Sequence, residues 1–514
     1  MTYPALLNFM ETTITARLAK VEENRTVYWE KYDPFVGHRV KWRASVMRHL
    51  FHILPGQKLL EIGAGDGLFT QSLAEVTNNE CEITAGIFSA KYENEIRKKL
   101  RGFNAEIVVL NHFPDSLQGK QFDYVVFWHL LEAESRNQIL HIVKSLIKPG
   151  GSLLAFEPNP WNPYLKARKM AQRILSVFRK DKLNTRPLNR IEIFSVLSEI
   201  GYTKINALPY DFLYAPIPKF LLWPAKHMSI IMENFPYIRN FAGSVCIWAS
   251  NPAMTDQERP AVDLCKHKMF YEKVSFVIPC HNEEMNVHPL ISGLKNFLGK
   301  YIYEIIIVDD NSSDKTADVT KDLSMQDNRI HLVRRTPPNG VGRALRDGIR
   351  EASGEYILIM DSDFQHIIPE MRDLFDAVAT GADVAVGSRF SRESVLINYG
   401  FTKIIANRTF HFLANLLLGI RFRDLSNNLK LFRREEAKRL EIESYDFAAN
   451  VETGLKPVLL GYRVVEVPIS WVNRSVDMGF STFQIFKTGP NYWKMLVRLV
   501  WRQITKQPCQ KKIG

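Results

Sequence analysis

Two carboxylates follow an apolar run in the stretch Tyr356-Ile-Leu-Ile-Met-Asp361-Ser-Asp363-Phe-Gln365-His366. The apolar run is typical of a buried strand in a parallel sheet. Side chains alternate along a strand, so we expect Asp361 and Asp363 to point the same way at its carboxyl end, where open α/β sheets bind ligands. These acids and the Gln365 amide oxygen suit Mg²⁺ or Mn²⁺. The alternative is a strand-ending turn with solvated acids.

Strands of the same design surround this stretch. Polar loops close the apolar runs Val274 to Cys280 and Tyr303 to Val308, and a further strand is expected from Asp383 to Ser388. Helical segments separate them, which predicts a mostly parallel, doubly wound sheet with its polar loops along one edge.

The length and composition set limits on the whole chain. Its 514 residues are too many for one ordinary core, so at least two domains are expected. The net charge of +12 favours anionic partners such as phosphorylated substrates or anionic lipid. No nucleic-acid-binding signature accompanies the charge, so we do not expect a nucleic-acid partner. The five cysteines form no C-x-x-C pair and indicate a reducing cytosol. No apolar run reaches the ~18 residues of a membrane span, and the N-terminus does not resemble a secretory signal.

Residues 271–483 resemble the family 2 inverting glycosyltransferases of the GT-A fold, and in particular the polyprenyl-phosphate type that includes the dolichyl-phosphate mannosyltransferases. The D-x-D-x-Q-H form of the central stretch is the form of that group. The resemblance implies a nucleotide-sugar donor, a polyprenyl-phosphate acceptor and a divalent metal. It assigns the nucleotide pocket to Pro279, His281 and Glu283, the nucleoside to Val308 and Asp310 with support from Asp309, and the metal and diphosphate to Asp361, Ser362, Asp363 and Gln365.

The acceptor site is less sharply defined. A polyprenyl phosphate is an anion that can attack without a general base, so it needs cations to hold it. Candidates are Arg389, in a G-S-R-F block, with Lys403, Arg408 and Arg474; Lys403 and Arg408 could instead form a solvated helix face. The pair Asn427-Asn428 stands where the family has a small residue and a glycine. A glycan or glycolipid hydroxyl is the alternative acceptor, and it would need Asp424 or Glu452 as a base. Glu452 could equally be a salt-bridged structural residue.

A glycine-rich turn follows an apolar strand earlier in the chain, at Glu61-Ile-Gly63-Ala-Gly65-Asp66-Gly67. Glycines allow close approach of a ligand, and the next helix offers free N–H groups. With the F-D-x-V strand from Phe122 and the K-P-G-G turn at 148–151, residues 40–250 resemble the class I S-adenosylmethionine-dependent methyltransferases. The resemblance assigns cofactor binding to Glu61, Gly63, Gly65 and Gly67.

This first domain departs from the family at the cofactor. Phe88 stands where an acid usually holds the ribose, which removes charge-assisted hydrogen bonds of ~1.5–3 kcal/mol each. Asn111 could contact the adenine, and His129 is a candidate base or a loop histidine packed near the cofactor. Two readings stay open, a working methyltransferase and a non-catalytic binding or scaffolding module.

The sequence therefore predicts an α/β protein with two doubly wound domains. The expected segments are a helical cap at 1–39, the methyltransferase-like domain at 40–250, a linker at 251–270, the glycosyltransferase domain at 271–485 and an amphipathic helix at 486–514. One face of this last helix is apolar (Trp493, Leu496, Val497, Val500, Trp501 and Ile504) and another basic (Lys494, Arg498 and Arg502). That pattern favours peripheral attachment to the cytoplasmic face of an anionic membrane; packing on the enzyme's own core is the alternative. The sugar, the methyl acceptor and the oligomeric state are not specified by the sequence.

Overall fold

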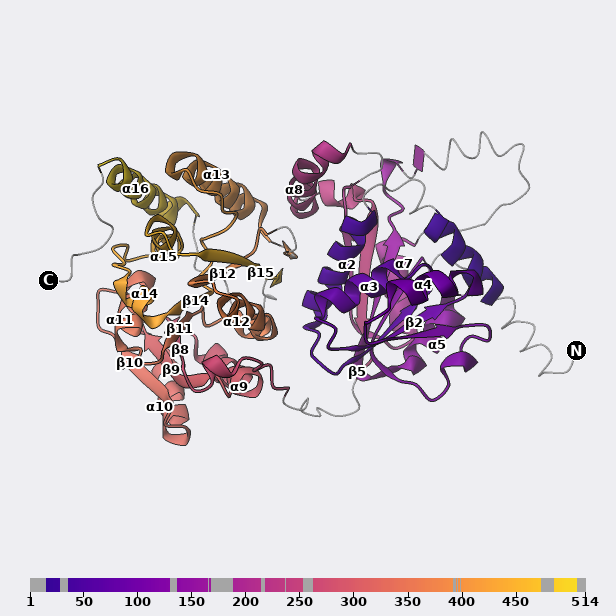
Figure 1. The fold of residues 1–514 in the computed structure, drawn as a ribbon, viewed down its shortest axis with the longest axis horizontal. Coiled ribbons are helices and arrows are strands. Elements are labelled where there is room, and N and C mark those ends of the chain that lie inside the picture. The colour runs from indigo at the N-terminus through magenta and orange to yellow at the C-terminus, as the bar shows by residue number, and fades with distance from the viewer. Residues whose placement is uncertain are drawn as a thin grey trace, which may run out of the picture. The chain divides into compact units, whose positions relative to one another are not determined.

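The computed structural model divides the chain into two compact units, residues 1–259 and 260–514 (Figure 1). The residues it describes are 15–27, 36–129, 136–164, 166–167, 188–213, 218–235, 237–252, 262–391, 394, 396–397, 399–472 and 485–505. Each unit is built on a seven-stranded sheet with helices, which confirms the α/β class with two sheet-based domains.

The sheet of the first unit has the order β3-β2-β1-β4-β5-β7-β6. Strands β1 to β5 run parallel, and β7 is antiparallel to both of its neighbours. The strands are β1 Lys58–Ile62, β2 Glu82–Ile87, β3 Ala105–Val109, β4 Phe122–Trp128, β5 Ile147–Pro158, β6 Thr203–Tyr210 and β7 Ser244–Ser250. The helices are one over 15–27, α2 Val36–Phe51, α3 Leu68–Val76, α4 Glu93–Lys99, α5 Arg136–Leu146, α7 Arg190–Glu199 and α8 Leu222–Asn234.

The second sheet has the order β10-β9-β8-β11-β14-β12-β15. It is mostly parallel, as expected, and β14 alone among its described strands is antiparallel to its neighbours. The strands are β8 Val274–Cys280, β9 Ile302–Asp309, β10 Ile330–Arg334, β11 Tyr356–Ile359, β12 Val384–Ser388, β14 Lys430–Arg433 and β15 Val464–Pro468, with a separate pair of β13 Leu396–Ile397 and β16 Trp471–Val472. The helices are α9 Glu284–Leu298, α10 Thr316–Gln326, α11 Val341–Glu351, α12 Arg372–Ala379, α13 Phe401–Leu418, α14 Arg434–Arg439, α15 Ala448–Leu459 and α16 Ile485–Ile504.

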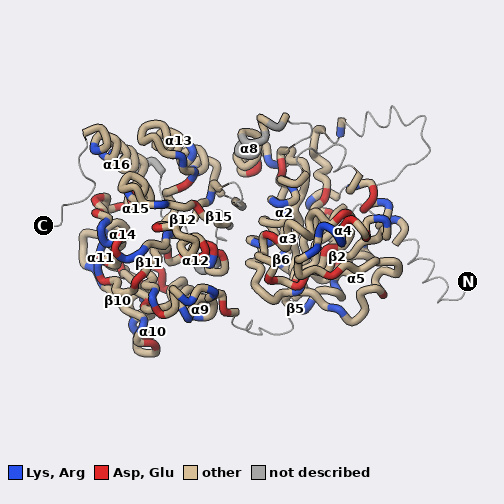
Figure 2. The backbone as a smooth tube through the Cα atoms, in the orientation of Figure 1, with Lys and Arg blue, Asp and Glu red and all other residues tan. Residues whose placement is uncertain are grey.

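The centre of each sheet is buried because its strands are apolar on both faces. All seven residues of β8 are buried, and α11 lies so close to the sheet that a Cβ on Gly348 would stand 2.4 Å from a Val277 methyl carbon. Basic and acidic residues are interspersed over the helices of both units, for example along α4 (Figure 2). The central strands therefore form a rigid support for the loops at their carboxyl ends.

Two segments differ from their expected roles. Residues 262–270, expected to be linker, pack on the second unit: Phe270 is fully buried and its ring contacts Tyr301, Tyr356 and Phe375. The helix α16 docks on its own unit, because Met495, Leu496 and Leu499 belong to the same core cluster as α13 and α15 residues. The face expected to be apolar is thereby divided, with Leu496 buried and Trp501 exposed.

Candidate functional sites

Asp361 and Asp363 follow β11 at the carboxyl edge of the second sheet. The neighbouring strand β14 is antiparallel and pairs Lys430 with Ile359, which brings the residues before β14 to this edge. The Asn428 amide Nδ2 donates to Asp361 Oδ1 at 2.7 Å. Burial, with the charge of Asp363 acting in the same direction, raises the pKa of Asp361 to about 7. The two carboxylates thus form an acidic pair that a cation would stabilise.

Asn428 is a residue of this edge that the sequence marked only as a departure from the family. Its side chain is buried, and its Oδ1 has no hydrogen-bond partner among the described residues. The adjacent Lys430 is fully buried, and its ammonium donates to the carbonyl of Asn427 and, at 2.8 Å, to that of Asn450. These bonds fix the backbone that presents Asn428 to Asp361. Burial also lowers the pKa of Lys430 to about 7.

The remaining residues assigned to the metal and acceptor lie at the same edge where the structure describes them. Ser362 is buried, and Asp363 immediately precedes the 3₁₀ helix Phe364–Glu370. That helix contains Gln365, whose side chain is outside the described part. Lys403 lies near Asp363 and Arg389: burial and the Arg389 charge lower its pKa, and Asp363 opposes the shift. Arg474 falls outside the described residues.

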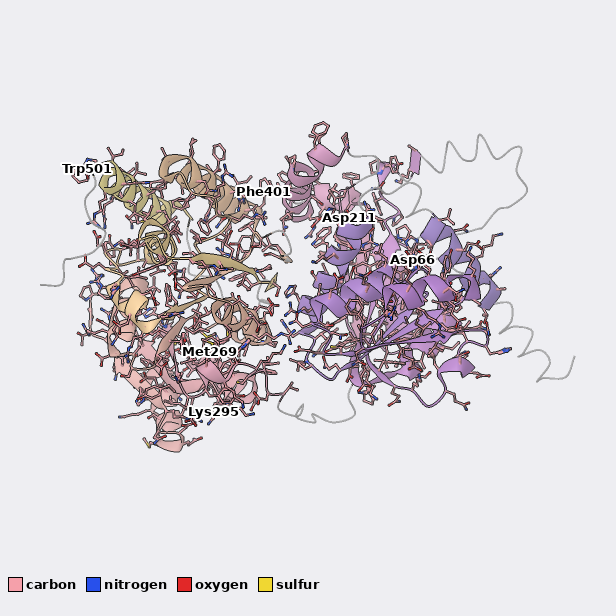
Figure 3. All side chains as sticks on the ribbon, in the orientation of Figure 1. Asp66, Asp211, Met269, Lys295, Phe401 and Trp501 are labelled. Atoms are coloured by element: carbon pink, nitrogen blue, oxygen red, sulfur yellow. The ribbon has the colours of Figure 1, made fainter. Side chains whose placement is uncertain are left out.

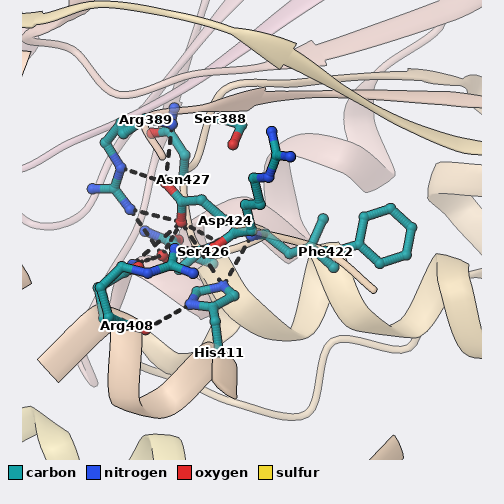
Figure 4. Close-up of polar contacts among 12 residues, drawn as sticks. Ser388, Arg389, Arg408, His411, Phe422, Asp424, Ser426 and Asn427 are labelled. Carbon is teal, nitrogen blue, oxygen red and sulfur yellow. Dashed lines mark hydrogen bonds and ion pairs between the residues drawn. The ribbon is translucent and has the colours of Figure 1, made fainter. Parts of the chain in front are cut away.

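Arg389 is held in a buried ion pair rather than left open to a phosphate (Figure 4). Its Nε donates to Asp424 Oδ2 at 2.8 Å, and its Nη2 donates to Asp424 Oδ1 at 3.1 Å. Its third nitrogen donates to the Tyr399 hydroxyl at 3.2 Å. Burial opposes ionisation of Asp424, but the Arg389 charge and its hydrogen bonds lower the pKa of that carboxyl well below its usual range. Arg389 therefore stabilises the loop of Asp424, and its expected role as a cation that holds the acceptor phosphate stays a prediction.

Two further side chains of α13 join this network. Arg408 donates to the Arg423 carbonyl at 2.6 Å and covers the Phe390 ring, so it is not a solvated helix face. His411 Nε2 accepts from the Leu425 amide at 3.0 Å, which requires a neutral ring with its proton on Nδ1, 2.9 Å from the Asn407 carbonyl. Burial lowers the pKa of His411 to about 4. The contacts of Arg389, Asp424, Arg408 and His411 therefore form a largely buried network with a structural role.

The residues expected to hold the nucleotide lie at the ends of β8 and β9. Asp310 accepts from the Gly340 amide at 2.6 Å and pairs with Arg335, which is in turn held by Asp347 at 2.7 Å. The His281 ring contacts the Asp310 carbonyl at 3.0 Å and is exposed. Arg335 was missed by the sequence reasoning, since its partners lie 25 and 12 residues away. Asp310, Arg335 and Asp347 form a charged corner at the end of β9, which β8 separates from β11 and its acidic pair.

The other residues of that group have structural contacts. The side chain of Val308 is fully buried in the core cluster, and Pro279 pairs with it in the parallel ladder. Asp309 is fully buried and accepts from the Ser312 amide at 3.1 Å. The Glu283 amide donates to Thr316 Oγ1 at 2.8 Å, which fixes the loop after β8. Among the residues expected to hold the nucleotide, His281 is the exposed one, and Asp310 of the charged corner is buried and paired with Arg335.

Neither candidate general base is in a state to act as one. Asp424 is paired with Arg389. Glu452 is buried, lies 2.6 Å from the Lys456 ammonium and accepts from the amides of Glu443 and Ser444 at 2.9 and 2.8 Å. The salt-bridged alternative for Glu452 is therefore the one the structure contains.

The glycine-rich turn of the first unit (residues 63–67) connects β1 to α3. Gly63, Gly65 and Gly67 have φ angles of 78°, 57° and 81°, a region that favours glycine. Glu61 is fully buried at the end of β1 and accepts from Thr70 Oγ1 at 2.5 Å and from Trp128 Nε1 at 2.9 Å. Burial raises its pKa to about 7. Glu61 therefore links β1 to helix α3 and to the end of β4.

The helix over residues 15–27 lies on this turn. Glu22 accepts from the amides of Gly65 and Phe88, and Arg25 donates to the Gly63 carbonyl at 2.5 Å. Sequence reasoning treated this helix as a cap and assigned neither residue.

The remaining cofactor candidates are placed as follows. Phe88 follows β2 and packs edge-on against Phe113 at 5.8 Å between ring centroids. Asn111 is exposed. His129 follows β4 with a φ of 55°, and burial, with the charges of Arg25 and Arg43, lowers its pKa to about 3, which makes it a weak base.

In comparisons with known proteins, each of the two units matches a different family. The sequence model of Glycosyl transferase family 2 matches residues 275–440, and that of the Methyltransferase domain matches residues 59–151. The chain is similar to the polyprenol monophosphomannose synthase of Mycolicibacterium smegmatis, with 29% identity over 214 residues that cover 40% of this chain and 80% of that protein. It is also similar to the dolichol-phosphate mannosyltransferase of Pyrococcus furiosus, with 31% identity over 202 residues that cover 39% of this chain and 56% of that protein.

Among solved structures, the chain is similar to glucosyl-3-phosphoglycerate synthase from Mycobacterium tuberculosis in complex with UDP. The identity is 17% and the TM-score 0.36, covering 45% of this chain and 80% of that one. A complex of the same enzyme with Mn²⁺, UDP and phosphoglyceric acid gives 18% identity and a TM-score of 0.36, covering 44% and 78%. The sequence matches confirm both resemblances: the chain joins a methyltransferase-type domain to a family 2 glycosyltransferase domain.

Proposed function

We propose that the second unit transfers a hexose from a nucleotide sugar to the phosphate of a polyprenyl phosphate, with inversion at the anomeric carbon. The single observation that carries this proposal is the acidic pair Asp361 and Asp363, which lies beside the Lys403 ammonium while both candidate bases are neutralised. Cations near the site and no available base favour an acceptor that is already an anion. Mannose is the first hexose to test, because both curated relatives are named for it.

The acidic pair fits a divalent metal. Burial and the repulsion between the two carboxylates raise the pKa of Asp361. A bound cation would stabilise the ionised form of the pair. The described residues contain no group of three or more His, Cys, Asp or Glu arranged for a metal, and Mg²⁺ commonly takes one or two carboxylates and completes its shell with water and substrate phosphates. Asp361 and Asp363 would hold the ion, which when bound offsets the charge that develops on the leaving diphosphate.

The chain's own residues position the reactants. Asn428 fixes the orientation of Asp361 through its 2.7 Å hydrogen bond, and the Arg389–Asp424 ion pair fixes the loop that carries Asn427 and Asn428. Lys403 is the cation we assign to the acceptor phosphate. A phosphate oxygen so held attacks the anomeric carbon as the bond to the diphosphate breaks, and no proton has to be removed from it.

An exposed apolar face extends from this site along α13 and α16, which contact each other through the Phe410 and Trp493 rings, 5.5 Å apart. We propose that this α13–α16 face lies on the membrane and lets the polyprenyl chain stay in the lipid. Figure 3 labels Phe401 at the start of α13 and Trp501 near the end of α16. The face consists of Ile405, Phe412, Leu416, Leu417, Trp493, Val497, Trp501 and Ile504.

The basic residues of α16 contribute less to this attachment than the sequence suggested. Arg498 and Arg502 both pair with Glu443, at 3.0 Å for Arg498, and Lys494 is exposed. Attachment should therefore depend mainly on apolar burial. Among the described residues there is no helix with the length and apolar character that a bilayer-crossing segment requires.

The test is transfer of radiolabelled sugar from GDP-mannose, then from a panel of other nucleotide sugars, to a short-chain polyprenyl phosphate, with Mn²⁺ or Mg²⁺. We expect a lipid product that mild acid hydrolyses, because a glycosyl phosphate is labile and an ordinary glycoside is not. A product stable to mild acid would indicate a hydroxyl acceptor. Metal-independent transfer, or full activity in Asp363→Ala, would contradict the mechanism.

A further inference from the structure

Helix 15–27 occupies the groups that a cofactor of the first unit would use. Glu22 Oε1 accepts from the Gly65 amide at 2.9 Å, and Glu22 Oε2 accepts from the amides of Phe88 and Ser89 at 3.1 and 3.0 Å. These amides lie at the carboxyl ends of β1 and β2, where open α/β sheets bind their ligands. One carboxylate of the chain thus takes three donors that would otherwise face a ligand.

Arg25 binds a backbone carbonyl of the same turn. Its guanidinium donates to the Gly63 carbonyl at 2.5 Å and lies 5.5 Å from the centroid of the Trp128 ring. Both Glu22 and Arg25 are buried, with 2% and 6% of their surfaces exposed. The carboxyl groups of Glu61 and Glu22 act electrostatically on the Arg25 guanidinium. The pair is therefore compensated inside the domain and needs no external counter-ion.

Thr26 closes the remaining space at the turn. A Cβ built on Gly65 would stand 2.5 Å from Thr26 Oγ1 and 3.2 Å from an Arg25 nitrogen. The close approach that the glycines allow is thus used by this helix. Phe88 takes part through its backbone amide, which donates to Glu22 Oε2 at 3.1 Å, and its ring lies against Gly63 of the same turn.

We propose that Glu22, Arg25 and Thr26 act as an internal ligand of the glycine-rich turn, so that S-adenosylmethionine binds the first unit only when helix 15–27 withdraws. The cofactor has an ammonium group, a carboxylate and ribose hydroxyls, and it needs the same amides and carbonyl that the internal ligand holds. The two are mutually exclusive. The turn as folded here does not fit the cofactor, and we derive no methyl-transfer step from it.

The experiment is calorimetric titration of the full-length protein with S-adenosylmethionine, and in parallel with S-adenosylhomocysteine. Wild type should show no binding at micromolar concentrations. The variant Glu22→Ala, which frees three amides, should gain at least tenfold in affinity. The matched control is Glu23→Ala, because Glu23 is on the same helix but is exposed and contacts Lys91 at the surface; it should behave as wild type.

Each other result overturns the proposal. Micromolar binding by wild type that Glu22→Ala weakens would make Glu22 a ligand of the cofactor. Equal absence of binding in both, with the variant folded, would mean that the helix is not what excludes the cofactor. If Glu22→Ala fails to fold, hydrogen exchange on wild type decides. The amides of Gly65, Phe88 and Ser89 should exchange slowly and should not respond to millimolar cofactor; fast exchange that the cofactor slows would contradict the internal ligand.

Discussion

The carboxyl edges of the two sheets have similar architecture. They differ in whether the polar groups at the edge are already compensated by other residues of the chain. In the first unit, one amide and one carbonyl of the glycine-rich turn are bonded to Glu22 and Arg25 of the chain itself. In the second, the acidic pair has a raised pKa at Asp361, and the adjacent Asn428 Oδ1 lacks a described partner. A family motif thus specifies how a strand ends, while distant segments determine whether that end is available to a ligand.

The largest expected effect is at the acidic pair. Asp363→Ala should lower sugar transfer by at least ~10²–10³-fold, the range for loss of one electrostatic stabiliser of a developing charge. The measurement is the radiolabel transfer assay at saturating metal. The control Asp322→Asn removes an exposed carboxylate of α10 and should be neutral. Equal losses in both variants would mean that general destabilisation, and not the site, accounts for the effect.

The network behind the pair predicts a pH dependence of stability in the second unit. His411 is neutral in the folded state with a pKa of about 4, against ~6.5 in the unfolded chain. The unfolded state therefore binds the His411 proton first as the pH falls, and the contribution of His411 to stability should decrease from about pH 6.5 to about pH 4, by at most ~3 kcal/mol.

This dependence can be followed by hydrogen exchange in peptides of α13 at pH 7 and pH 5, corrected for intrinsic exchange rates. His411→Gln should flatten the pH dependence relative to wild type, whatever its own stability. A dependence of unchanged size in the variant would assign it to other groups.

Asn428 should act as a positioning residue for Asp361. Asn428→Ala removes one hydrogen bond to a charged group and should weaken metal-dependent transfer by 10–100-fold, the usual range for a partner of a metal ligand. The telling readout is the concentration of Mn²⁺ that gives half-maximal activity, which should rise in the variant. A fall in the maximal rate with an unchanged Mn²⁺ requirement would indicate a merely structural role.

The smallest effects concern the membrane face. Trp501→Ala should reduce co-sedimentation with anionic liposomes by about tenfold, since burial of a large apolar side chain contributes ~1.5–3 kcal/mol. Arg502→Ala should change it less, because Arg502 is paired with Glu443, although an unpaired cation near an anionic surface contributes ~1 kcal/mol. The reverse order would mean that charge, and not apolar burial, drives attachment.

Part of the fold and of the candidate sites could be predicted from the sequence, because the patterns that specify them are local. The apolar runs of β8 and β11, the two carboxylates after β11 and the glycines of the turn are short patterns with a fixed geometry. The pairing of Arg389 with Asp424 is different, since the two residues are 35 positions apart and the G-S-R-F block looks the same whether its arginine is free or paired.

The internal ligand was beyond sequence reasoning for the same reason. Glu22 meets Phe88 across 66 residues, and nothing in the sequence of helix 15–27 distinguishes its buried Glu22 from its exposed Glu23. The Phe88 departure was visible but had two readings, weakened binding or loss of function.

The most direct test of this contrast is calorimetric titration of one preparation of the full-length protein with two ligand classes. The first is a panel of nucleoside diphosphates with Mn²⁺, and the second is S-adenosylmethionine. We predict that at least one diphosphate binds, that its binding requires Mn²⁺ and is lost in Asp363→Ala, and that wild type does not bind S-adenosylmethionine at micromolar concentrations. Micromolar binding of S-adenosylmethionine with no binding of any diphosphate would contradict the account.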